Sequence, residues 1–314
     1  MLKFNLKPDQ VRRQVLLQVA KLKRLKQNFR AYDLARVALN KFSAAGHYQV
    51  QQNIAYGFKA RQRLDLYLSN NVSQHHGQRQ AKGLVIFVYG GAWQHGSRQD
   101  YIFVAEALTR HGYDVAIIDY QLAPQHKFPS YVDDLALAIR YLQDKQQQYA
   151  IAAERLALLG HSAGAFNCMS LLYHPRYQDA DFQAHIAAVI GIAGPYHFDY
   201  VGDRLAEDAF DQQVSYQQVM PYYFVRPHQA RHYLLLAPYD RVVAAQNSYD
   251  MQQQLLAQQN HCQLQQIAHT GHVTIMGSMA SIFSRFFNTQ QRVIAALDES
   301  FALFNDQASD KKSA

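Results

Sequence analysis

The chain has 314 residues, 49% of them hydrophobic, which is enough for one large core with a small appendage. Its two cysteines, Cys168 and Cys262, lie far apart without metal-ligand spacing. The composition therefore excludes a disulfide framework and favours a reduced, cytoplasmic chain with no metal or other cofactor. No signal peptide is evident, and no run approaches the roughly 18 apolar residues that span a bilayer.

The net charge of +7 belongs to the first 30 residues, which carry nine Lys and Arg and a single Asp, so the other 284 residues sum to −1. Residues 8–42 predict one or two amphipathic helices, because apolar side chains recur at spacings of three and four and cations fill the other face. We therefore divide the chain into a basic helical extension, residues 1–49, and a main domain, residues 50–314.

Several roles are open for the basic extension. The first expectation is that it docks on the body of the protein and solvates its outer side. Alternatively, residues 8–30 bind an anionic membrane surface. A subunit contact is a further alternative, with the oligomeric state left open. The segment has no aromatic interleaving and no known nucleic-acid motif, so no nucleic-acid partner is expected.

The main domain begins with a predicted antiparallel hairpin, because Ile54–Gly57 and Arg63–Leu68 flank a turn and alternate in polarity. Residues 69–82 predict a polar loop. Further strands are predicted at Leu84–Val88, Val115–Ile118, Leu156–Leu159, Ile186–Ile192, Tyr233–Leu236 and Gln263–Ile267. Helices are predicted at about 100–111, at 131–143, after Ser162, at 246–258 and from about 275 to 305, with an irregular stretch at 196–231.

This alternation of apolar strands and helices predicts an α/β fold. We expect a mostly parallel eight-stranded sheet with helices on both faces. Active sites in such sheets lie beyond the carboxyl ends of the strands.

One strand-to-helix turn has the pattern Gly160-His161-Ser162-Ala163-Gly164. Gly160 and Gly164 have no side chains, so the backbone can bend sharply and the helix can pack closely. Ser162 is then placed at the helix N-terminus, where backbone N–H groups stabilise a developing negative charge. The pattern predicts a nucleophile elbow, against the alternative of a structural turn.

A serine nucleophile needs a base, and the base needs an orienting anion. On this architecture the acid and then the histidine follow the serine in the chain. Asp240 follows the next-to-last predicted strand and is the expected acid; Asp250 is weaker because it falls within a predicted helix. His272, just past the last strand, is favoured as the base over His269. His161 is expected to point away from the base.

A glycine-rich loop directly follows the strand Leu84–Val88. Small residues there allow backbone N–H groups to approach a substrate carbonyl. We expect Gly91, Ala92 and Ala163 to form an oxyanion hole, with Tyr89 and Gly90 supporting the loop.

The motifs that carry a family resemblance are Arg63-Leu64-Asp65-Leu66-Tyr67, Tyr89-Gly90-Gly91-Ala92-Trp93, Asp119-Tyr120-Gln121-Leu122-Ala123-Pro124, Gly160-His161-Ser162-Ala163-Gly164, Ala193-Gly194-Pro195-Tyr196 and Gly271-His272. Together they resemble the α/β-hydrolase superfamily, and within it the carboxylesterases of the hormone-sensitive-lipase-like and ferulic-esterase-like (BD-FAE-type) group. The resemblance covers residues 50 to 290 or so and leaves out the basic extension. It is specific for the fold and the triad and only weakly specific for the substrate.

The chain departs from this family pattern in two places. The family usually has a histidine at the position of Tyr89, where it braces the loop by hydrogen bonding, and a tyrosine hydroxyl can replace it. Before the expected acid the chain has Ala237-Pro238, where the family often has His-Gly.

The resemblance implies a serine hydrolase that cleaves small carboxylic esters through an acyl-enzyme. Ser162 is the expected nucleophile, His272 the base and Asp240 the acid, and a small-molecule ester is the expected partner. Relatives with the same machinery include arylformamidases, which cleave N-formylkynurenine, and some peptidases. A non-catalytic binding protein on this scaffold is a third alternative, which the order of the triad residues argues against.

Overall fold

The computed structural model describes residue 40 and residues 47–75, 78–178 and 180–313. Residues 8–30, and most of the helices predicted at 8–42, lie outside this part of the chain. Every helix that the structure describes is too short or too polar to cross a bilayer.

Within the described residues, eight strands form one sheet in the order β1-β2-β6-β5-β7-β8-β9-β10. Their bounds are β1 Tyr48–Ala55, β2 Arg63–Ser69, β5 Leu84–Val88, β6 Asp114–Ile118, β7 Leu156–His161, β8 Ile186–Ile192, β9 Arg231–Leu236 and β10 Cys262–Gln266. The β1–β2 hairpin is antiparallel, and β2 is also antiparallel to β6. The remaining neighbours are parallel, which confirms the predicted α/β sheet.

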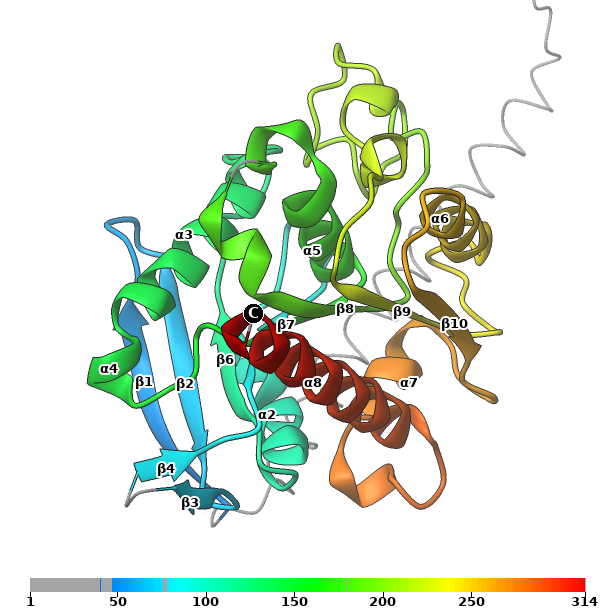
Figure 1. The fold of residues 1–314 in the computed structure, drawn as a ribbon. Helices are drawn as coiled ribbons and strands as arrows, with labels where there is room; N and C mark the ends of the chain where they lie inside the picture. The colour runs from blue at the N-terminus through cyan, green and yellow to red at the C-terminus, as the bar shows by residue number, and fades with distance from the viewer. Residues whose placement is uncertain (1–39, 41–46, 76–77, 179, 314) are drawn as a thin grey trace, which may run out of the picture.

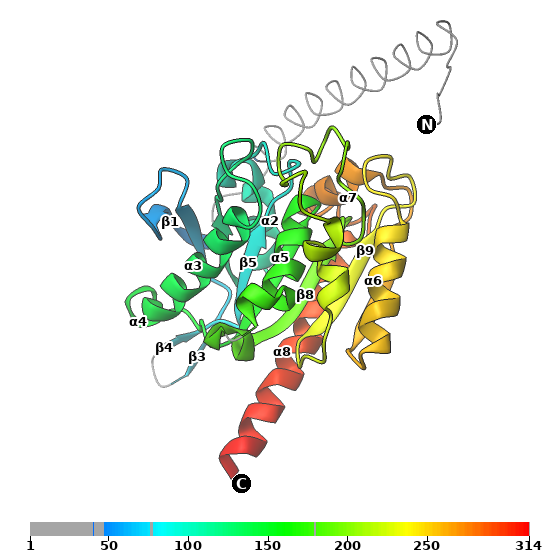
Figure 2. The same ribbon diagram turned by 90° about the horizontal axis from the view of Figure 1, so that it is seen from above.

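The central strands are apolar except for Asp114 at the start of β6 and His161 at the end of β7, because helices cover both faces of the sheet. Every residue of β5, β6, β7 and β8 is buried. The longer helices are α2 Ile102–Thr109, α3 Ser130–Asp144, α5 Ala163–Tyr173, α6 Gln246–Ala257 and α8 Thr289–Ser313. Figure 1 shows α3, α5 and α6 on one face of the sheet and α2 and α8 on the other. Seen from above, α7 (His272–Gly277) lies at one end of the sheet and the last turns of α8 project from the other (Figure 2).

The short elements complete the chain and differ in part from the sequence prediction. The polar loop expected at 69–82 contains a small hairpin of β3 (Ser73–His75) and β4 (Gln78–Gln80). A short helix, α4 (Gln146–Tyr149), follows α3. The 3-10 helices are η1 Arg98–Tyr101, η2 Pro175–Tyr177, η3 Asp181–His185, η4 Tyr216–Gln218, η5 Pro221–Phe224 and η6 Ser281–Phe283. Most of the stretch at 196–231 is otherwise irregular, as predicted.

The single helix predicted from about residue 275 to 305 is wrong. The structure has α7, then η6, and only then α8, which begins at Thr289. The Ser278 hydroxyl donates to the backbone carbonyl of Ile275 and is within 2.5 Å of the Thr289 hydroxyl. The first of these bonds is local and occupies the Ile275 carbonyl, while the backbone N–H of Met279 donates to Met276 instead, as it does where an α-helix ends. The second bond joins the end of α7 to the start of α8.

The turn between β7 and α5 is a strained elbow. Ser162 has φ 52° and ψ −122°, a conformation that non-glycine residues rarely adopt. A Cβ atom on Gly164 would lie 1.9 Å from the carbonyl oxygen of Val88 and 2.6 Å from that of Tyr89. Both are backbone atoms of the neighbouring strand and loop, so only glycine lets α5 begin this close to β5.

We expect Gly164→Ala to lower the free energy of unfolding by more than about 3 kcal/mol, because the clash with the Val88 carbonyl is relieved only by moving α5 away from β5. Urea denaturation measures this loss. The matched control is Gly202→Ala, where φ is +73° and no atom lies within 4 Å, so the cost is about 1 kcal/mol from the backbone conformation alone. Equal losses in the two variants would contradict the close-contact explanation.

Candidate active site

Three side chains from separate elements form a hydrogen-bonded chain at the carboxyl ends of the strands. Ser162 lies in the turn between β7 and α5, Asp240 follows β9, and His272 is the first residue of α7. The Nε2 atom of His272 is 2.9 Å from the Ser162 hydroxyl oxygen. Its Nδ1 atom is 2.7 Å from the Asp240 carboxylate. This is the arrangement that a Ser-His-Asp triad requires.

The Asp240 carboxylate is held by its own loop as well as by His272. Its Oδ1 atom accepts hydrogen bonds from the backbone N–H groups of Val242 (2.8 Å) and Val243 (2.9 Å), which leaves Oδ2 for the imidazole. Burial by itself would raise the pKa of Asp240, but the hydrogen bond and charge of His272 and the two N–H groups outweigh it and lower the pKa. The carboxylate is therefore ionised near neutral pH and orients the imidazole.

The two weaker candidates from the sequence lie elsewhere. His269 is exposed. Asp250 on α6 pairs with His197 (2.6 Å) and accepts from the Gln246 side chain. The structure therefore brings Asp240 and His272, and not Asp250 or His269, to Ser162.

His161 does not point away from the base as the sequence suggested. Its Nε2 atom is 3.0 Å from the backbone carbonyl oxygen of His272, and the two rings lie 5.0 Å apart. Because a carbonyl only accepts, Nε2 carries the proton, and Nδ1 is buried with no partner among the described residues. Burial and the neighbouring His272 lower the pKa of His161 to about 3, so this ring is neutral beside the base.

The loop expected to form an oxyanion hole turns tightly over Ser162. The backbone N–H groups of Gln94 and His95 both donate to the Gly91 carbonyl at 3.0 Å. Ala92 has φ 51° and lines a cavity together with Ser162 and Ala163. Gly91 is the residue before it in the same turn, so the three expected donors belong to two chain segments that meet at Ser162.

A cavity of about 200 Å³ adjoins Ser162. Its walls are mainly apolar and come from the loop after β5, the turn at Ser162, residues 195–206 and residues 242–247. The side chains other than those named above are Trp93, Pro195, Phe198, Asp203, Leu205, Ala206, Ala244 and Asn247. Trp93 is a fixed wall, because its indole N–H donates to the Asn167 side chain (2.9 Å) and its ring packs on Phe210 (4.8 Å between centroids).

A larger cavity, of about 600 Å³, lies at the amino ends of the strands, where β6 begins with Asp114 and Arg155 precedes β7. Its lining does not include Ser162, so the smaller cavity is the one that matters for chemistry at the triad. Among the described residues, no group of three His, Cys, Asp or Glu side chains is placed to hold a metal ion.

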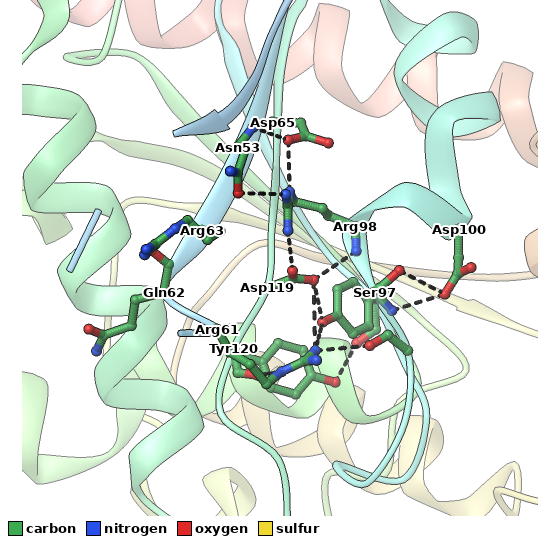
Figure 3. Close-up of polar contacts among 12 residues, drawn as sticks. Asn53, Arg61, Gln62, Arg63, Asp65, Ser97, Arg98, Asp100, Asp119 and Tyr120 are labelled. Carbon is green, nitrogen blue, oxygen red and sulfur yellow. Dashed lines mark hydrogen bonds and ion pairs between the residues drawn. The ribbon is translucent and has the colours of Figure 1, made fainter. Parts of the chain in front are cut away.

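A buried ionic network adjoins the loop that follows β5 (Figure 3). Most of it was not predicted from the sequence. The Tyr89 hydroxyl donates to Asp119 (2.8 Å), the carboxylate that follows β6. Arg98 also binds Asp119 and donates to Asp65 on β2 (2.7 Å). Arg61 in the β1–β2 turn donates to the Tyr89 hydroxyl (2.7 Å). Asp65 and Asp119 fall within motifs of the family resemblance, but no sequence signal pointed to Arg61.

The neutral His161 makes stability depend on pH. In the unfolded chain this residue gains a proton as the pH falls through about 6.5, whereas in the folded chain it does so only near 3. Between these values the unfolded state binds more protons, so acidification destabilises the fold. We expect His161→Gln to flatten the decline of unfolding free energy in this window, by at most about 1.4 kcal/mol per pH unit. His228 and His232, also with lowered pKa values, act equally in both proteins. Parallel curves in urea titrations would contradict the assignment.

Curated relatives of this chain are named as esterases for the most part. A probable isoprenylcysteine alpha-carbonyl methylesterase of Oryza sativa subsp. japonica is 28% identical over 206 residues, 60% of this chain and 47% of the relative. Esterase LipC of Mycobacterium tuberculosis is 30% identical over 162 residues, 48% of this chain and 38% of the relative. A kynurenine formamidase of Drosophila melanogaster is 28% identical over 144 residues, 46% and 45%. The chain thus spans less than half the length of each.

Solved structures show the same fold at lower sequence identity. Esterase B from Lactobacillus rhamnosis superposes with a TM-score of 0.74 and 17% identity, over 93% of this chain and 97% of that one. A truncated carbohydrate esterase from gut microbiota superposes with a TM-score of 0.69 and 16% identity, over 82% of this chain and 99% of that one. The family model named BD-FAE matches residues 64–255, which is more than half of the chain and includes the turn at Ser162. The chain belongs to the BD-FAE family, the ferulic-esterase-like group of the α/β-hydrolases.

Proposed function

We propose that the protein is a serine hydrolase that cleaves small carboxylic esters through an acyl-enzyme. The observation that carries this proposal is the chain of hydrogen bonds from Ser162 through His272 to Asp240, placed at the mouth of a small apolar cavity. The esterase names of several relatives support the same reaction class.

The first half of the reaction transfers the acyl group to the enzyme. Ser162 Oγ attacks the ester carbonyl carbon while His272 Nε2 accepts the hydroxyl proton. The bond between the carbonyl carbon and the alcohol oxygen then breaks, and the alcohol leaves with the proton from His272. Asp240 holds the Nδ1–H of the imidazole and stabilises its positive charge while the proton is on Nε2.

The second half releases the acid and restores the enzyme. Water attacks the carbonyl carbon of the acyl-enzyme and gives its proton to His272, which returns a proton to Ser162 as the carboxylic acid leaves. In both halves the carbonyl oxygen becomes negatively charged. The backbone N–H groups of Gly91, Ala92 and Ala163 are assigned to stabilise it, and such a donor contributes roughly 3–4 kcal/mol to the transition state.

The cavity supports a small group on at least one side of the scissile bond. Its volume of about 200 Å³ is below the roughly 300–1,000 Å³ typical of sites for drug-sized ligands. Trp93 forms one wall of the cavity, and Phe198 and Leu205 line it from the irregular segment. We assign this cavity to a short acyl chain.

Formamide cleavage is the alternative on the same machinery, and one relative is named a kynurenine formamidase. The kcat/KM values for a short ester and for N-formylkynurenine, measured side by side, distinguish the two. A higher value for N-formylkynurenine would replace the ester proposal with the formamidase one.

The triad assignment predicts that Ser162→Ala lowers kcat for p-nitrophenyl butyrate by at least about 10³-fold and abolishes labelling by a serine-directed phosphonate. Asp240→Asn should lower kcat by about 10⁴-fold, because the imidazole loses its orienting carboxylate. Asp250→Asn is the matched control and should keep kcat within about threefold. Full activity of Ser162→Ala would overturn the proposed mechanism.

The cavity predicts a preference for short acyl chains. We expect kcat/KM for p-nitrophenyl acetate and butyrate to exceed that for the octanoate by more than about tenfold. Leu205→Ala enlarges the cavity and should raise the octanoate-to-butyrate ratio about tenfold. Val201→Ala, an exposed position on the same segment, should leave the ratio unchanged. An unaltered ratio in Leu205→Ala would place the acyl chain elsewhere.

A further inference from the structure

The oxyanion loop, defined as residues 89–97, is fastened at both ends by one side chain. The Nη2 atom of Arg61 donates to the Tyr89 hydroxyl (2.7 Å) and to the carbonyl oxygen of Gly96 (2.9 Å). Its Nε atom donates to the carbonyl oxygen of Tyr120 (2.7 Å). Because Tyr89 begins the loop and Gly96 lies near its end, a single guanidinium closes the loop from behind.

We propose that Arg61 is a positioning residue that holds the oxyanion loop in the geometry needed for catalysis. It acts through Tyr89 and Gly96 and contacts no reacting atom. The inference rests on the proposed function, because it concerns how the expected N–H donors of Gly91 and Ala92 are kept next to Ser162.

The partners of Arg61 are themselves fixed. The Tyr89 ring lies between two others, 4.9 Å from Tyr120 and 5.4 Å from Tyr101. The Tyr120 hydroxyl donates to the Tyr89 carbonyl (2.9 Å). Burial and the adjacent Asp119 carboxylate raise the pKa of Tyr89 well above its usual value, so the hydroxyl stays protonated and donates a hydrogen bond to Asp119.

The other end of the loop packs against the same ring. Gly96 has φ +105°, and a Cβ atom there would lie 2.8 Å from the Tyr89 ring. The next residues begin η1, where the backbone N–H of Arg98 donates to the Asp119 carboxylate (2.7 Å). The two ends of the loop therefore meet at Tyr89 and Asp119, and Arg61 joins them.

The charges of the network balance. Arg61 and Arg98 face Asp119 and Asp65, and the side chains of Arg98, Asp65 and Asp119 are each less than a tenth exposed. Arg61 itself is about one third exposed (32%). If Arg61 is truncated, water can therefore take over some of its hydrogen bonds and part of its contribution to stability. Water cannot hold three acceptors in fixed positions around one planar group, as the guanidinium does.

Arg63 is the natural control for this proposal. It lies two residues further along the chain, as the first residue of β2, and in the described part of the chain its guanidinium donates to the carbonyl oxygens of Gly57, Lys59 and Gln62 within the hairpin. Figure 3 shows its side chain lying apart from Asp119, whereas Arg61 reaches the network. If losing any arginine from this hairpin lowers activity, substitution of Arg63 should therefore lower it as much as substitution of Arg61 does.

The experiment compares Arg61→Ala and Arg63→Ala on p-nitrophenyl butyrate. Arg61→Ala should lower kcat by about 10- to 100-fold, part of the value of one oxyanion donor, and leave KM within about threefold, because the misplaced donors act on charge that develops only in the transition state. Arg63→Ala should stay within about twofold in both constants. Millimolar guanidinium should restore kcat several-fold in Arg61→Ala alone, since the partly exposed site opens to solvent on truncation.

The proposal is overturned by wild-type kcat in Arg61→Ala, by an equal loss in Arg63→Ala, by a change confined to KM, or by no response of kcat to guanidinium. Should Arg61→Ala fail to fold, Tyr89→Phe, which removes the hydroxyl that Arg61 holds, must lower kcat at least threefold, and wild-type kcat there overturns the proposal. Ser162→Ala in the same assay separates the two claims: an active variant overturns the proposed function and the inference with it. An inactive one, alongside wild-type kcat in Arg61→Ala, overturns the inference alone.

Discussion

The close approach of α5 to the end of β5 is the constraint on which the site depends. With no side chain at Gly164, the first turn of the helix lies against the carbonyl groups of Val88 and Tyr89. Ser162 is thereby forced into a conformation with positive φ, and the packing of strand and helix offsets the strain. The same contact brings the loop after β5 beside Ala163. Ser162 and the loop after β5 are thus fixed relative to each other by contacts between backbone atoms alone.

The electrostatic environment of His272 depends on the charge states of its two titratable neighbours, Asp240 and His161. Asp240 is ionised because three hydrogen bonds outweigh its burial. His161, 5.0 Å away, stays neutral because burial opposes its charge. A charged ring at that distance would disfavour the imidazolium that the proposed reaction requires, whereas a neutral one that donates to the His272 backbone helps to place it. His272 therefore lies between one carboxylate and one neutral ring.

The sequence predicts best what neighbouring residues decide together. The pattern at 160–164 and the apolar strand before it belong to one continuous segment, so the sharp turn from a buried strand into a helix was predictable. The network of Arg61, Arg98 and Asp119 was not, because its members come from three separate segments whose meeting depends on the order of strands in the sheet. The helix break was missed for a related reason: besides its bond to Ile275, the Ser278 hydroxyl bonds the Thr289 hydroxyl eleven residues later, outside any helical period.

The oxyanion loop also connects the ionic network to the substrate cavity. On one side it is bound to Asp119 and Arg61 through Tyr89. On the other, the Gln94 side chain donates to the carbonyl oxygen of Leu205 in the irregular segment that narrows the cavity (3.2 Å). In the proposed mechanism, an acyl group too large for the cavity displaces Leu205 and, through this hydrogen bond, the loop that presents the proposed N–H donors. Substrates that fit poorly are then expected to lose turnover as well as binding.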